Sequence, residues 1–180
     1  LLYMGDSAVG DIYLVHSFDR KKIIGRPNIY PILDDFSGLV AGIAVTNENP
    51  NWMPFLLALD NCNRDKVEYC AEYGIRISKS MWPSEGFPAA IKLDRAEGIS
   101  RVSTKLNNLQ IRIENTASYR PDWKGLVEKW IHLMNLEAQR LPGGITHPHK
   151  RGENDVRLLA CLTPEEFIKA IIHFVIFYNN

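Results

Sequence analysis

Residues 89–94 read AAIKLD, and this short run decides the fold class. Residues 89–93 are apolar apart from Lys92, as expected of a short strand buried within a sheet. The run follows a long helical segment instead of another strand. We therefore expect strands and helices to alternate from this point on, which predicts an α/β protein.

On the N-terminal side of this run, three segments have the composition of strands, at residues 2–15, 28–33 and 39–45. The sequence DFSG at 35–38 has turn chemistry and separates the last two. These segments predict an antiparallel meander. A single helix is expected at 52–73, because apolar residues recur there at helical spacing.

On the C-terminal side we expect a short helix at residues 103–109, a strand at 110–114 and a helix at 121–139. The last of these has an apolar stripe formed by Leu126, Trp130, Leu133 and Leu136. Residues 163–166 read TPEE, a capping box that opens a final helix running to about residue 178.

This order of elements is the one expected of an RNase H-like fold, with a mixed five-stranded sheet flanked by helices and an appended C-terminal helix. We divide the chain into a core at 1–145 and a loop with a C-terminal helix at 146–180 that packs on the core. Neither end looks like a natural terminus, so we expect a fragment of a longer protein.

The composition limits the partners and the compartment. Lys plus Arg equal Asp plus Glu at 21 each, which argues against a stand-alone nucleic-acid binder but not against a catalytic core anchored by other domains. Cys62 and Cys70 fall on one face of the helix expected at 52–73, and we expect both to be buried thiols. With Cys161 they show no metal-ligand spacing. The odd count of three argues against a disulfide framework and favours a reducing, cytoplasmic setting.

Three acids are candidates for a metal site, because Mg²⁺ prefers carboxylate oxygens and acids at strand ends can line a site in an α/β sheet. Asp6 lies in the first strand, Asp94 directly follows residues 89–93, and Glu128 lies in the first turns of the helix at 121–139. Spacing alone makes their convergence only possible, because the chain has 21 acids.

Alternatives remain open for each acid. Asp11 competes with Asp6, and Glu97 competes with Asp94. Glu128 could instead pair with Lys124 on an exposed helix face.

Five segments of the chain form an ordered set, namely residues 6–15, residues 24–30 with 33–37, and residues 91–97, 119–128 and 162–180. This set resembles the TnsB-like transposases of heteromeric bacterial transposons, and it covers nearly the whole chain. The wider group includes phage Mu transposase and the retroviral integrases.

The resemblance implies the catalytic core of a DDE transposase, which cleaves the 3′ ends of a transposon and transfers them to target DNA. Asp6, Asp94 and Glu128 would hold two Mg²⁺ ions, for which Mn²⁺ can substitute. Basic residues near the glutamate would contact phosphates of the DNA end, and these are Arg120, Lys124 and Lys129.

The same resemblance implies a set of partners. These are transposon-end DNA, target DNA, further copies of the protein on paired ends, a target-selecting ATPase and an endonuclease subunit. It implies action at the bacterial nucleoid and no membrane partner.

Two positions depart from the family pattern. Ala96 stands where the second-aspartate motif usually has glycine, and Gly5 could loosen the strand just before Asp6. Two alternative functions therefore remain: an inactive RNase H-like DNA-binding or interaction module, and a simple RNase H-like nuclease.

Other polar residues have simpler interpretations. Asp34 and Asp35 point to opposite faces, so we expect a turn with Ser37 instead of a shared metal site. His132 and His173 are expected to be structural residues within apolar helix faces, and residues 147–151 are expected to form an exposed loop.

Overall fold

The computed structural model describes residues 1–48, 52–93, 106, 109–115, 125–147 and 155–180. A six-stranded mixed sheet forms the middle layer, in the order β6–β5–β1–β7–β8, with β2 beside β5 in line with β1. Its strands are β1 (Leu2–Gly5), β2 (Ala8–Val9), β5 (Asn28–Asp34), β6 (Val40–Thr46), β7 (Ala90–Leu93) and β8 (Arg112–Asn115).

The directions of the strands match the predicted fold. β5 runs antiparallel to both β1 and β6, whereas β7 runs parallel to both β1 and β8. The sheet is therefore an antiparallel meander that continues into parallel strands, as the sequence indicated. The prediction of an RNase H-like mixed sheet flanked by helices is confirmed. The sheet has six strands where five were predicted, because β2 forms a separate short strand beside β5.

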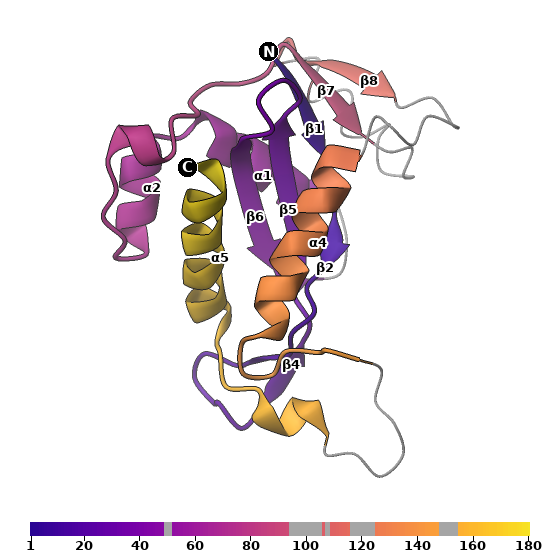
Figure 1. Cartoon of the computed structure of the whole chain (residues 1–180), viewed down its shortest axis with the longest axis vertical. Coiled ribbons are helices and arrows are strands. Elements are labelled where there is room, and N and C mark those ends of the chain that lie inside the picture. The colour runs from indigo at the N-terminus through magenta and orange to yellow at the C-terminus, as the bar shows by residue number, and fades with distance from the viewer. Residues whose placement is uncertain (49–51, 94–105, 107–108, 116–124, 148–154) are drawn as a thin grey trace.

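Helices cover both faces of the sheet (Figure 1). One face packs against α1 (Trp52–Asn63), and the other packs against α4 (Gly125–Gln139) and α5 (Pro164–Asn179). Strand alternation assigns the side chains of β1 to these faces. Tyr3 belongs to the core cluster beneath α1, so Met4 points to the face that α4 covers.

The first predicted strand, at residues 2–15, is wrong in its length. It divides into β1, β2 and β3 (Leu14–Val15), and β3 pairs with β4 (Ile23–Gly25) as a separate two-stranded sheet. Between β1 and β2, Asp6 Oδ1 accepts a hydrogen bond from the backbone N–H of Ser7 at 2.8 Å. A side chain bonded to the next amide competes with strand pairing.

The single helix predicted at 52–73 is also wrong, because α1 is followed by a separate helix, α2 (Lys66–Glu72). Asp65 caps α2 by accepting from the backbone amides of Val67 and Glu68 at 2.8 and 3.0 Å. The buried Lys66 ammonium donates to carbonyls at the end of α1, including that of Asn61 at 2.6 Å. Cys62 and Cys70 are both buried, as predicted, but they lie in different helices.

The buried stripe of α4 differs from the predicted one. Its fully buried residues are Val127, Trp130, Met134 and Ala138. Leu136 of the predicted stripe is 40% exposed, because the helix turns that position away from the core. His132 on α4 and His173 on α5 are exposed, so the prediction that they lie within apolar faces is wrong.

The C-terminal helix begins as predicted. The Thr163 hydroxyl accepts from the Glu166 amide at 3.3 Å, and the Glu166 carboxylate accepts from the Thr163 amide at 2.9 Å. The rings of Trp130 on α4 and Phe174 on α5 pack in a tilted arrangement with centroids 5.7 Å apart, which joins the two helices over the sheet. Within the described ranges, no helix is long and apolar enough to cross a membrane.

Candidate active site

Gly5 ends β1 directly before Asp6 and is tightly packed. It pairs with Ile32 of β5, and a Cβ built on Gly5 would lie 2.7 Å from Cε2 of Phe55. The same Cβ would lie 3.1 Å from Cδ2 of Leu93. Glycine at this position therefore allows α1 and β7 to approach the strand closely, a packing role that the sequence did not indicate.

The register of β1 and β7 aligns their carboxyl ends. Met4 is the partner of Lys92 in this parallel pair, and both side chains point to the face that α4 covers. Asp6 follows Met4 by two positions, so strand alternation directs its carboxylate to the same face. The Asp6 side chain is partly exposed there.

Lys92 forms an ion pair with Asp35, whose backbone amide donates to the Leu2 carbonyl at the end of β1 opposite Asp6. The Lys92 ammonium lies 3.0 Å from the Asp35 carboxylate, and its side chain is only 12% exposed. Asp34 instead accepts from the backbone amide and the hydroxyl of Ser37 at 3.0 and 2.6 Å. The two acids thus divide their roles between a turn and an ion pair, and the predicted turn is confirmed.

Contacts near the C-terminal end of helix α4 hold it against Asp11, which follows β2. The Asn135 side-chain oxygen accepts from the backbone amide of Asp11 at 2.9 Å, and Gln139 Nε2 donates to the Asp11 carboxylate at 3.0 Å. Glu128 lies about two helical turns before Asn135 and so faces the same side of the helix.

Simple geometry relates Glu128 to Asp6. The five residues from Asp6 to Asp11 span about 16 Å if extended, and the helix from Glu128 to Gln139 also spans about 16 Å. Gln139 and Asp11 are in contact, and β1 and α4 both run downward in Figure 1. Ideal strand and helix geometry therefore puts Glu128 and Asp6 towards the same end of this interface. The Glu128 carboxylate is exposed.

The alternative acid in this region, Asp11, has a structural role. Arg26 Nη2 donates to Asp11 Oδ1 at 2.6 Å, while Gln139 occupies Oδ2. Both carboxylate oxygens therefore bond to protein groups. Asp11 thus holds Arg26 and Gln139 in place.

Several predicted residues lie outside the described ranges: Asp94, Arg120, Lys124, Ala96 and Glu97. Lys129 is described and exposed, next to Glu128 on α4. The described part of the chain, which lacks Asp94, contains no group of three or more His, Cys, Asp or Glu residues that could hold a metal ion. The carboxylates of Asp6 and Glu128 are hard oxygen donors of the kind that Mg²⁺ binds.

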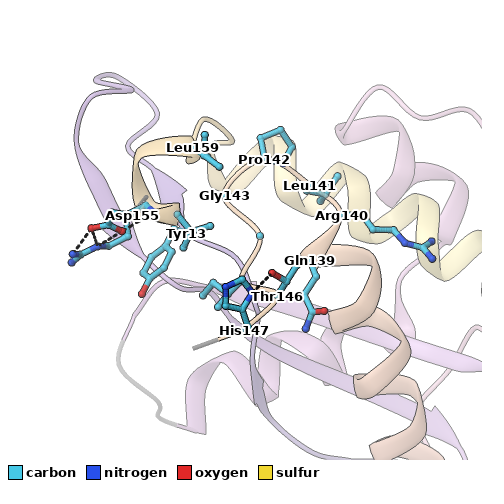
Figure 2. A pocket seen from close by; sticks show the side chains of 14 residues that line it. Tyr13, Gln139, Arg140, Leu141, Pro142, Gly143, Thr146, His147, Asp155 and Leu159 are labelled. Atoms are coloured by element: carbon cyan, nitrogen blue, oxygen red, sulfur yellow. Dashed lines mark hydrogen bonds and ion pairs between the residues drawn. The ribbon is translucent and has the colours of Figure 1, made fainter. Parts of the chain in front are cut away.

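A cavity of about 710 Å³ lies at the opposite end of α4, beyond Gln139 (Figure 2). Four of its polar and charged lining residues already bond to one another in pairs. Arg157 pairs with Asp155 at 2.5 Å, and His147 Nδ1 lies 2.9 Å from the Thr146 hydroxyl. The cavity is therefore separate from the end of α4 that carries Glu128.

Comparison with known proteins identifies the family. Residues 4–144 match the family model described as the TnsB C-terminal domain. Over 182 aligned residues the chain is 36% identical to the transposon Tn7 transposition protein TnsB of Escherichia coli, with 99% of the chain covered. The chain thus belongs to the TnsB C-terminal domain family, as the sequence motifs suggested. It spans about a quarter, 26%, of the length of that relative.

Among solved structures, the chain is similar to a chain of the simian T-cell lymphotropic virus intasome in complex with the PP2A regulatory subunit B56 gamma. The TM-score is 0.43 at 13% identity, covering 88% of this chain and 53% of that one. It is also similar to the catalytic core domain of BIV integrase, with a TM-score of 0.37 at 14% identity and 96% of each chain covered.

Proposed function

We propose that this chain is the metal-dependent catalytic core of a transposase, which cleaves the 3′ ends of transposon DNA and joins them to target DNA. The observation that carries the proposal is the alignment of α4 with the segment from Asp6 to Asp11. By ideal strand and helix geometry, this alignment would bring Glu128 and Asp6 to one end of a shared interface. Membership of the TnsB family supports the same function.

Asp94 completes the proposed set of ligands. The register supports this assignment, because Met4 and Lys92 are partners and each precedes one of the two aspartates by two positions. Asp6, Asp94 and Glu128 would hold the metal ions through their carboxylate oxygens.

The proposed chemistry needs little else from the protein. Two bound Mg²⁺ ions, or Mn²⁺ in their place, would supply activation of the attacking oxygen and charge stabilisation of the leaving one. The side chains hold the metal-binding oxygens in place. Water would be the nucleophile at the transposon 3′ end, and the freed 3′-OH would then attack target DNA in line.

The proposed partners follow from the family. Lys129, with Arg120 and Lys124, would contact phosphates of the transposon end. Because the chain is neutral, most of the affinity for DNA would come from other domains of the full-length protein. Further copies of the protein, a target-selecting ATPase and an endonuclease subunit would complete the assembly.

A strand-transfer assay tests the proposal. Full-length protein is given a pre-cut transposon end with a free 3′-OH, target DNA and Mg²⁺. Asp6→Asn, Asp94→Asn and Glu128→Gln should each reduce joining by on the order of a hundredfold or more, because each removes a charge that stabilises the transition state. Asp19→Asn changes an exposed hairpin acid and should leave joining intact.

The outcomes separate the alternative functions. Joining that survives Asp6→Asn or Glu128→Gln would refute the site. Cleavage without joining by the unaltered protein would indicate a simple nuclease. DNA binding without either reaction, in Mg²⁺ and in Mn²⁺, would indicate an inactive binding module.

A further inference from the structure

The contacts of Asp11 join the segment that follows β1, which begins with Asp6, to helix α4, which carries Glu128. Asp11 receives bonds from Arg26 at 2.6 Å and from Gln139 at 3.0 Å, and its own amide donates to Asn135 at 2.9 Å. The Arg26 and Asp11 side chains are 35% and 29% exposed, so solvent screens this pair less than a fully exposed one. Asp11, which follows β2, therefore bonds both to Arg26, directly after β4, and to two residues of α4.

Backbone bonds strengthen the same junction. Ile12 bridges Gly144 in antiparallel fashion, and the amide of Ile145 donates to the Asp11 carbonyl at 2.8 Å. Arg26 Nε also donates to the Gly10 carbonyl at 2.9 Å. The end of α4 is thus held against this segment, and sliding the helix along it would break several of these bonds together.

We propose that Asp11 is a positioning residue. It fixes the position of α4 along the segment from Asp6 to Asp11, and so holds Glu128 at the end of that segment where Asp6 lies. The inference rests on the proposed function, because it concerns the same metal site. A slip of one residue would move Glu128 by about 1.5 Å along the helix axis. That shift is large for a ligand of Mg²⁺, which requires near-ideal geometry at about 2.0–2.1 Å.

The test uses the full-length protein carrying Asp11→Asn together with Asn135→Leu. Glu137→Gln is the matched control, because it removes an exposed ion pair with Arg140 on the same helix. The first measurement is Mn²⁺ affinity with transposon-end DNA bound, followed by electron paramagnetic resonance. Loss of groups that orient metal ligands typically weakens binding about ten- to hundredfold, and we expect this for the double variant only.

The second measurement is independent of the metal. Spin labels are placed on the exposed positions Val9→Cys and His132→Cys, in a Cys161→Ser background because Cys161 is the exposed native thiol. Without metal, the label-to-label distance should shift or its distribution should broaden in the double variant. The control should match the unaltered protein.

The results distinguish the two proposals. A lower melting temperature with unchanged label distance, or with unchanged Mn²⁺ affinity, would overturn the positioning role. Equal weakening by Glu137→Gln would overturn it as well. If the distance changes while Asp6→Asn still binds Mn²⁺ normally, Asp11 positions α4 but the proposed metal site is wrong.

Discussion

At the scale of single residues, Gly5 has the clearest steric role. A Cβ there would lie 2.7 Å from the Phe55 ring, so Gly5→Ala requires the ring to shift. We expect a loss of about 1–3 kcal/mol in the free energy of unfolding, as for other overpacked cores. Urea unfolding measures the loss.

Two further variants check this explanation. Phe55→Leu should reduce the cost of Gly5→Ala, because the shorter side chain removes the clashing ring atoms. Gly125→Ala should be neutral or slightly stabilising, since no atom of the described residues lies within 4 Å of its Cβ position at the start of α4. If Gly5→Ala costs nothing, the close approach of Phe55 is not the reason for glycine.

Local sequence could not decide whether Asp6 or Asp11 is the candidate metal ligand. Both are acids in the first predicted strand, and local sequence does not separate them. The partners that occupy Asp11, Arg26 and Gln139, are 15 and 128 positions away. Only the tertiary fold reveals that Asp11 is already bonded.

At the scale of elements, the capping box of α5 is reinforced from a distant hairpin. Arg20 donates to both Glu166 oxygens, at 3.0 and 2.6 Å, and also to the Cys161 carbonyl at 2.8 Å. The Arg20 guanidinium and the Thr163 amide lower the pKa of Glu166 to about 2. The carboxylate therefore stabilises the fold when it is charged.

The pH dependence of the free energy of unfolding follows from the lowered pKa of Glu166. Because the pKa of Glu166 is lower in the folded than in the unfolded state, its contribution is present above about pH 4.5. It is lost as the pH falls towards 2. Glu166→Gln should therefore lower the free energy of unfolding at pH 7, and the difference from the unaltered protein should vanish near pH 2. Because the ion pair is largely exposed, high salt should shrink the difference. A difference that is constant with pH would contradict this account.

The sequence predicted where helices and strands occur better than it predicted where they break. The strands at 28–33 and 39–45, the buried run at 89–93 and the start of α5 were all found from local patterns. The break between α1 and α2 was missed because apolar periodicity continues across it, although Asp65 is a residue type that favours helix starts. The α4 stripe was shifted because Leu136 is apolar but turned outward.

At the scale of the whole molecule, the proposed metal site joins two layers. Asp6 comes from the sheet and Glu128 comes from the helix layer on one face, so a bound ion links these layers. Binding to the folded state alone should then raise the global free energy of unfolding. The gain is about 2.7 kcal/mol when the free metal is at a hundred times its dissociation constant.

Thermal unfolding of the full-length protein with increasing Mn²⁺ measures this linkage. The melting temperature should rise with Mn²⁺ in the unaltered protein and in Glu137→Gln, which keeps both proposed ligands. It should rise much less in Asp6→Asn and in Glu128→Gln. An equal rise of the melting temperature in all four proteins would show that the metal binds elsewhere. If only Asp6→Asn reduces the rise, the metal site does not join the sheet to α4.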